Sequence, residues 1–171
     1  MTDGTGRGGL HQADGWPPLS TRPLCIAEFE VAGGIVDLGA SPFGNRRLGY
    51  ITGGRFFGDR LAGTILPGGG NWSQSGRVGN ASMGTFDARS VWQTEDGGLI
   101  QVSYGGRSVI PDGVRQKFMT NEAVDPSEYY LRIAPVFETA DANYSWLNGI
   151  LAVGVGERTE FGVRHMIHEV V

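Results

Sequence analysis

The sequence predicts an all-β protein: an antiparallel, closed or nearly closed β-barrel of about 8–10 strands with one short helix. Three observations predict it. Nine segments have strand-type composition, glycine supplies 29 of the 171 residues and gathers between those segments, and a single segment has helical spacing. Short strands separated by turn signals every ~8–15 residues are typical of an antiparallel sandwich or barrel.

The expected strands follow one another from residue 24 to residue 170. They are Leu24–Val31, Gly34–Leu38, Arg47–Thr52, Leu61–Leu66, Thr85–Thr94, Leu99–Tyr104, Tyr129–Phe137, Tyr144–Gly154 and Val163–Val170. The pair Asp96-Gly97 between two of them is the strongest hairpin signal, because Asp-Gly suits the turns that join paired strands. Glycines inside the segments, such as Gly49 and Gly63, favour a strongly curved sheet.

Only Pro111–Met119 has helical spacing, with Val114 and Phe118 on one face. We expect one short helix there, placed to plug an end of the barrel. Residues 1–21 are rich in glycine, proline and polar residues and predict a flexible leader, with a single barrel domain over residues 22–171. The leader has no apolar stretch of the secretory type, so a cytoplasmic protein is expected.

Composition excludes several classes of function. With 14 basic and 18 acidic residues the net charge is −4, which lacks the basic footprint of a nucleic-acid binder. The apolar runs fall far short of the ~20 residues that a membrane helix needs. The single cysteine, Cys25, forbids an internal disulfide, and His165 and His168 would face opposite sides of a strand. Neither a metal nor another cofactor is expected, and neither nucleic acid nor membrane is an expected partner.

Two stretches carry polar side chains that could do chemistry. Strand alternation places Asp87 and Arg89 on one face of their segment, and Tyr130 and Arg132 on one face of theirs. If those faces point inward, the charges form a pocket, because buried charges persist where they are paired or functional. If they point outward, the same residues are ordinary cross-strand pairs on the solvent face. The sequence leaves both readings open.

The order of several motifs resembles the DUF3237 (UPF0311) family over residues 24–171. The motifs are Ala40-Ser41-Pro42-Phe43-Gly44-Asn45-Arg46-Arg47, Ile51-Thr52-Gly53-Gly54, Leu66-Pro67-Gly68-Gly69, Phe86-Asp87-Ala88-Arg89, Val124-Asp125-Pro126 and Trp146-Leu147-Asn148. The resemblance implies a closed or nearly closed antiparallel barrel, and it implies no common reaction.

Four positions depart from the family pattern. Asn71 stands where the family usually has Asp, Gly149 where an Arg follows Trp-Leu-Asn, and His168 where a Tyr is typical. Ser103–Arg107, which includes Tyr104, replaces an Asn-Arg-Gly-like stretch. We expect these positions to tune the pocket for a particular substrate, and placement away from any cavity would refute that.

The leading functional prediction is a cofactor-independent enzyme that moves protons on a small carbonyl- or phenol-bearing organic molecule, as an isomerase, cyclase or lyase. Carboxylates, tyrosine and arginine suffice for acid–base work without a metal or nucleotide. In this prediction Asp87 or Glu138 is the base, and Arg89 and Arg132 stabilise a developing enolate or phenolate. Tyr130 donates a hydrogen bond, and His168 is a second candidate base.

The predicted substrate contacts are mostly aromatic side chains; they are Trp72, Trp92, Tyr104, Phe137, Trp146 and Asn148. The prediction requires the ionisable groups near positions 87, 132 and 138 to converge on an enclosed hollow. The alternative is a non-catalytic small-molecule-binding barrel, whose polar residues satisfy one another. A small organic molecule is the expected partner, and self-association into a homo-oligomer stays open.

Overall fold

Eleven antiparallel strands, one α-helix and two 3-10 helices make up residues 17–31 and 35–171, the part of the chain that this computed structural model describes. The elements in chain order are β1 (Thr21–Glu30), β2 (Ile35–Ser41), β3 (Gly44–Ile51), β4 (Gly53–Phe57), β5 (Gly63–Ile65), β6 (Gly69–Val78), β7 (Ala81–Thr94), β8 (Leu99–Pro111), α1 (Asp112–Met119), η1 (Pro126–Glu128), β9 (Tyr130–Glu138), η2 (Ala142–Gly149), β10 (Ala152–Arg158) and β11 (Gly162–Val170).

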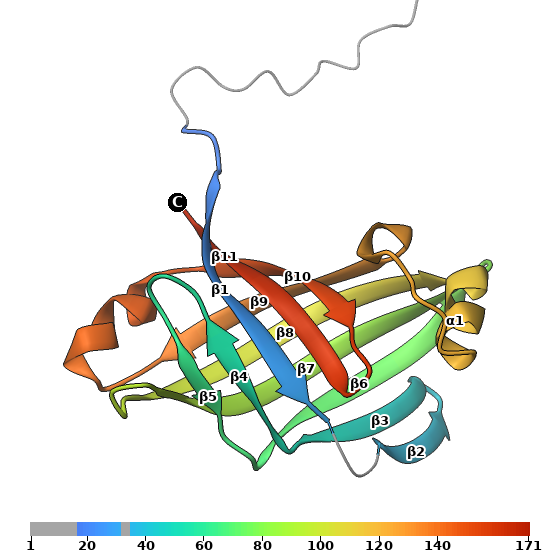
Figure 1. Cartoon of the computed structure of the whole chain (residues 1–171). Helices are drawn as coiled ribbons and strands as arrows, with labels where there is room; N and C mark the ends of the chain where they lie inside the picture. The colour runs from blue at the N-terminus through green and yellow to red at the C-terminus, as the bar shows by residue number, and fades with distance from the viewer. Residues whose placement is uncertain (1–16, 32–34) are drawn as a thin grey trace, which may run out of the picture.

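The strands form one sheet that closes into a ring. Its order is β2-β3-β6-β7-β5-β4-β1-β11-β10-β9-β8, and pairing of β7 with β8 completes the circle. β7 is shared: residues 92–94 pair with β5, whereas residues 81–89 pair with β6. As a result β6, β3 and β2 continue the sheet beyond the ring, toward the end that carries α1 (Figure 1).

Strand alternation decides which side chains fill the ring. Along β8, Ile100, Val102 and Tyr104 are buried while Gln101 between them is exposed. Along β7, Ala88 and Trp92 are fully buried on the same face. The inward face of each strand therefore supplies the core, as the two-residue period of a strand requires.

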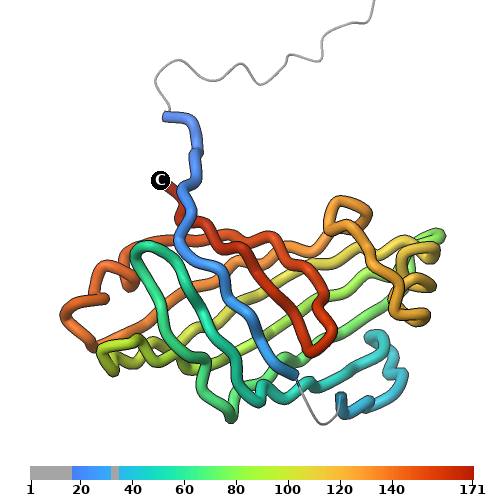
Figure 2. The backbone as a smooth tube through the Cα atoms, in the orientation of Figure 1, coloured from blue at the N-terminus to red at the C-terminus, as the bar shows by residue number. Residues whose placement is uncertain are grey.

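The ring has two different ends, which we call the η2 end and the α1 end. At the η2 end, Leu147 of η2 is fully buried in the main core, and Trp92 stacks on Phe56 with ring centroids 4.5 Å apart. At the α1 end the sheet splays into β2, β3 and β6. β1 lies antiparallel to β11, so the two ends of the described chain are adjacent (Figure 2).

The predicted fold class is confirmed, with the qualification that the sheet is ring-like and carries a splayed extension. The hairpin at Asp96-Gly97 joins β7 to β8, and the predicted helix is α1. The leader predicted over residues 1–21 lies mainly outside the described residues, and Thr21 is already the first residue of β1. Cys25 is buried, as expected of a small hydrophobe, and burial raises the pKa of its thiol to about 12.

Three local predictions need correction. Residues 144–149 lie in η2 and not in a strand, because the Asp141 carboxylate accepts the Asn143 amide and caps a helical turn. η2 therefore also covers one end of the ring: its Leu147 lies in the main core cluster, whereas Val114 of α1 is buried outside that cluster. The sequence also failed to predict β4 and β6 as strands. β6 is polar and glycine-rich, so its strand conformation comes from pairing with β3 and β7 rather than from its own pattern.

Candidate functional site

The interior of the ring changes character along β7. Inward-facing Ala88, Ser90, Trp92 and Thr94 are buried, whereas inward-facing Ser82, Gly84 and Phe86 nearer α1 are only partly buried. On neighbouring β6, Ser73 and Ser75, which pair with Phe86 and Gly84, are also partly buried, and Arg77, which pairs with Ser82, is exposed. The inward positions are therefore fully buried at the η2 end and less buried toward the α1 end.

His165 lies where these two zones meet. It is 2% exposed on the inner face of β11, and its cross-strand partners are Ala27 on β1 and Gly156 on β10. Those small neighbours leave room for the imidazole, since a Cβ on Gly156 would lie 2.7 Å from the His165 Nδ1. The Nδ1 atom is buried and has no hydrogen-bond partner among the described residues.

Tyr104 reaches the same zone from the opposite side of the ring. Its ring centroid lies 5.6 Å from that of His165, in an edge-on arrangement, and Phe29 packs against both rings. Tyr104 is 7% exposed, and its hydroxyl makes no hydrogen bond within the described part of the chain. The pair therefore presents a phenol and an imidazole side by side, each without a polar partner.

Asn71 adds a third such group. Asn71 and Tyr104 both pair with Ala88, from β6 and β8, so their Cα atoms are about 10 Å apart on one face. The Asn71 Oδ1 is buried and has no hydrogen-bond partner. In residues 17–31 and 35–171, this atom and His165 Nδ1 are the two buried side-chain polar atoms without a partner. A buried polar atom without a partner costs about 1–3 kcal/mol, which a hydrogen bond from a ligand or an ordered water would offset.

Burial sets the protonation of this cluster. It lowers the pKa of His165 to about 4 and raises the pKa of Tyr104 above its usual range. At neutral pH the imidazole is therefore uncharged and keeps a lone pair, while the phenol keeps its proton. One group can accept a proton and the other can donate a hydrogen bond, which is the pairing that acid–base chemistry needs.

The predicted acid–base residues of β7 and β9 do not converge on this interior. Asp87 and Arg89 point outward with side chains 68% and 70% exposed, and their ionic groups lie 3.9 Å apart. Glu138 is exposed on the outer face of β9. The expectation of an enclosed hollow around residues 87, 132 and 138 is wrong, because the inward positions of these strands are the even residues of β7 and the odd residues of β9.

The predicted substrate contacts divide into four groups. Tyr104 faces the interior cluster described above. Trp92 and Phe137 are packed in the core, and Trp72 is 48% exposed on the outer face of β6.

The remaining two contacts, Trp146 and Asn148, lie in η2. The Asn148 amide group bonds both backbone polar atoms of Thr139, at 2.8 and 2.9 Å, and Arg60 lies 4.1 Å from the centre of the Trp146 ring. These contacts hold η2 against the rest of the protein, so Trp146 and Asn148 have a structural role.

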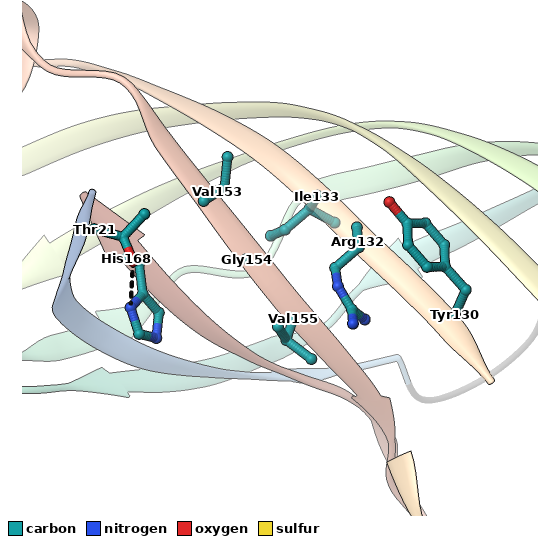
Figure 3. Close-up of a pocket in the computed structure, with 8 residues that line it drawn as sticks. All are labelled: Thr21, Tyr130, Arg132, Ile133, Val153, Gly154, Val155 and His168. Carbon is teal, nitrogen blue, oxygen red and sulfur yellow. Dashed lines mark hydrogen bonds between the residues drawn. The ribbon is translucent and has the colours of Figure 1, made fainter. Parts of the chain in front are cut away.

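The other predicted catalytic residues, Tyr130, Arg132 and His168, are brought together, but outside the ring. They line a hollow on the outer face of β9, β10 and β11 (Figure 3). Of the positions that depart from the family pattern, 71 and 104 face the interior, 168 lines this outer hollow, and Gly149 is exposed at the end of η2.

His165 has no catalytic role in the sequence-based prediction, which considers this residue only together with His168 as a metal site. The opposite orientation that argued against such a site is observed: His165 faces inward and His168 outward. The available signal was the alternation Val163, His165, Ile167, in which a histidine occupies a core position. Among the described residues, no group of three or more His, Cys, Asp or Glu could hold a metal ion.

The family model described as "Protein of unknown function (DUF3237)" matches residues 20–170. The chain belongs to this family. A UPF0311 protein from Rhodopseudomonas palustris strain TIE-1 is 30% identical over 155 residues, which cover 91% of this chain and 99% of that protein. The predicted family membership is thereby confirmed.

Solved structures of family-like proteins share the fold. A beta-barrel like protein from Acinetobacter baumannii AYE is 32% identical with a TM-score of 0.78, covering 91% of this chain and 98% of that one. A conserved protein of unknown function from Rhodopseudomonas palustris reaches a TM-score of 0.81 at 29% identity, covering 91% and 100%. An enzyme from Penicillium herquei, at 22% identity and a TM-score of 0.62 over 91% and 96%, shares the fold alone.

No helix in the described ranges is both long and apolar enough to cross a membrane. The family model and the solved structures establish the family and the barrel-like fold, and they assign no reaction to this chain.

Proposed function

We propose that this protein binds a small carbonyl- or phenol-bearing organic molecule inside the α1 end of the ring and moves a proton on it. The observation that carries the proposal is the meeting of His165, whose buried Nδ1 has no hydrogen-bond partner, with Tyr104, which is 7% exposed and whose ring centroid lies 5.6 Å from the imidazole. A ligand with a polar oxygen would supply the missing hydrogen bonds, and the enclosing aromatic rings would contact its apolar part.

The proposed chemical step uses both groups. His165 Nδ1 accepts a proton from the carbon beside the carbonyl, the C–H electron pair forms a carbon–carbon double bond, and the carbonyl electron pair moves to oxygen. Tyr104 donates a hydrogen bond to that oxygen as charge develops. The negative charge of the enolate stabilises the imidazolium form of His165. This stabilisation offsets the lowering of the His165 pKa by burial. In a substrate with a carbon–carbon double bond next to the deprotonated carbon, the intermediate is a dienolate; return of the proton to its far carbon shifts the double bond into conjugation, re-forms the carbonyl and completes an isomerisation.

Hydrogen–deuterium exchange tests this step without knowledge of the natural substrate. We expect the protein in D₂O to accelerate exchange of the acidic α-hydrogens of 2-tetralone, followed by mass spectrometry. His165→Phe should abolish the acceleration, and Tyr104→Phe should lower it by about 10²-fold, as loss of one oxyanion donor does elsewhere. Gln101→Ala, on the exposed outer face of β8, is the matched control and should exchange like the wild type.

A non-catalytic binding protein is the second candidate, and one observation favours it. The resemblance to the family implies an Asp at position 71 where this chain has Asn71, so the interior cluster lacks a carboxylate that could act as a base. Binding of 2-tetralone with unaltered exchange, in wild type and His165→Phe alike, would establish that function and overturn the catalytic one.

A further inference from the structure

The hollow on the outer face lies over β10 and is separate from the interior cluster. Its volume is about 370 Å³, within the ~300–1,000 Å³ typical of small-molecule sites. Val153 and Val155 of β10 form its apolar floor, Thr21 and His168 line one side, and Tyr130 and Arg132 line the other (Figure 3). β9 and β10 share only two registered pairs, Gly154 with Ile133 and Val155 with Arg132.

Arg132 supplies a positioned positive charge to this hollow. Its guanidinium lies 4.8 Å from the centre of the Tyr130 ring, and its Nη1 donates to the Leu131 carbonyl at 2.9 Å. No carboxylate of the described chain lies within ion-pair distance of it. Stacking on an aromatic ring holds the guanidinium fork in place, and its remaining N–H groups are free for a bidentate acceptor.

His168 stands at the diagonally opposite corner. By register it neighbours Val153, whereas Arg132 neighbours Val155. The Thr21 hydroxyl lies 3.5 Å from the His168 Nδ1, which orients the ring and leaves Nε2 for a ligand. The acidic residue of β10 closest to this floor, Glu157, is already paired with Arg164. The hollow is therefore an apolar floor with one cation and one imidazole at its two corners, and no competing acid.

We propose that this hollow is a second binding site, for a small monocarboxylate with an apolar body. The carboxylate would take the bidentate fork of Arg132. The apolar body would lie on Val153 and Val155, and a polar group at the far end would reach His168. This inference does not depend on the proposed function, because none of these residues contributes to the interior cluster.

Benzoate and uncharged benzyl alcohol are the probes, because they share an aromatic body and differ in the carboxylate. In a ¹H–¹⁵N NMR titration, benzoate should shift the signals of Arg132, His168 and the β10 floor, and benzyl alcohol should bind about tenfold more weakly. Arg132→Gln should weaken benzoate binding by about tenfold, since it removes a charge-assisted hydrogen-bond pair. Arg46→Gln is the matched control: Arg46 is exposed on β3 and its loss should change nothing.

Val153→Trp distinguishes benzoate binding in the hollow from non-specific attraction of benzoate to the charge of Arg132. It fills the apolar floor on the solvent side of the sheet and keeps Arg132, so it should abolish benzoate binding while the unfolding midpoint stays unchanged. Equal binding of benzoate by Arg132→Gln, Val153→Trp and wild type would overturn the proposal. So would signals of the β10 floor that move with protein concentration alone, which would mean that a second copy of the chain covers the hollow.

Discussion

The two ends of the ring use the same inward strand positions in opposite ways. At the η2 end, polar atoms are paired: the Trp92 indole donates to Ser90 at 3.0 Å and the Thr139 hydroxyl donates to the Leu99 carbonyl at 2.7 Å. Glu169 is held by Arg22 at 2.8 Å and Arg60 at 2.5 Å. Toward the α1 end, His165 and Asn71 carry buried atoms with no partner in the described residues.

Because of this difference, we expect the η2 end to contribute mainly to stability and the interior cluster mainly to ligand binding. A satisfied polar group at the η2 end contributes to folding, whereas an unsatisfied group toward the α1 end costs folding free energy and, in the proposed function, takes its hydrogen bond from a ligand. The account therefore predicts that substitutions at the η2 end weaken the fold strongly, and that substitutions of the interior cluster weaken it little.

The largest expected effect is at the packed end of the core. Trp92→Ala removes a fully buried ring that stacks on Phe56 and contacts Phe137, and should lower the free energy of unfolding by about 3–5 kcal/mol. Urea unfolding followed by circular dichroism measures it. A loss below ~1 kcal/mol would mean that the η2 end is not the stabilising region.

Glu169→Gln should follow, with a loss of about 2 kcal/mol. The substitution removes the charge that two arginines bond and leaves both guanidinium groups without their carboxylate. Those bonds hold the pKa of Glu169 at about 2. The wild-type contribution is present above pH ~4.5 and is lost as pH falls toward 2, so the gap between variant and wild type should shrink on acidification. A gap that is constant from pH 7 to pH 3 would contradict this assignment.

His165 should give the protein a stability gradient between pH 6.5 and pH 4. Its folded pKa of about 4 lies below the ordinary ~6.5, so the unfolded chain binds more protons in that window and stability falls as pH falls. The expected loss from pH 7 to pH 5 is about 2 kcal/mol. His165→Phe should remove this part of the gradient and leave stability at pH 7 within ~1 kcal/mol of wild type. An unchanged gradient in the variant would place the titrating group elsewhere.

The smallest effect is expected on the outer face. Asp87→Asn should change the free energy of unfolding by less than ~0.5 kcal/mol, because Asp87 and Arg89 are exposed and their ionic groups are 3.9 Å apart. The same denaturation series measures it. A loss above ~1 kcal/mol would show that the outer pair is structurally important after all.

The fold was predictable because local patterns agreed with one another. The Asp96-Gly97 turn, the alternation along β7 and β8 and the family resemblance all indicate an antiparallel barrel. β6 was not predictable, because its glycine and serine residues carry no alternating apolar pattern and its neighbours impose its conformation.

The candidate site was less predictable than the fold, since alternation alone does not say which face of a strand points inward. Asp87 and Ala88 belong to opposite faces, and the sequence left both orientations open. The structure places Ala88 inside, between Asn71 and Tyr104. The prediction favoured charged side chains, whereas the polar groups of the interior cluster are the His165 imidazole, the Tyr104 phenol and the Asn71 amide.

The most direct test is ¹⁵N NMR of the His165 imidazole with phenol as the probe ligand. The account predicts that phenol moves the His165 ring nitrogen resonances together with the Asn71 side-chain amide, and that Tyr104→Phe weakens the response. Phenol signals confined to the outer surface, with the His165 nitrogens unmoved at saturation, would contradict a ligand site inside the ring.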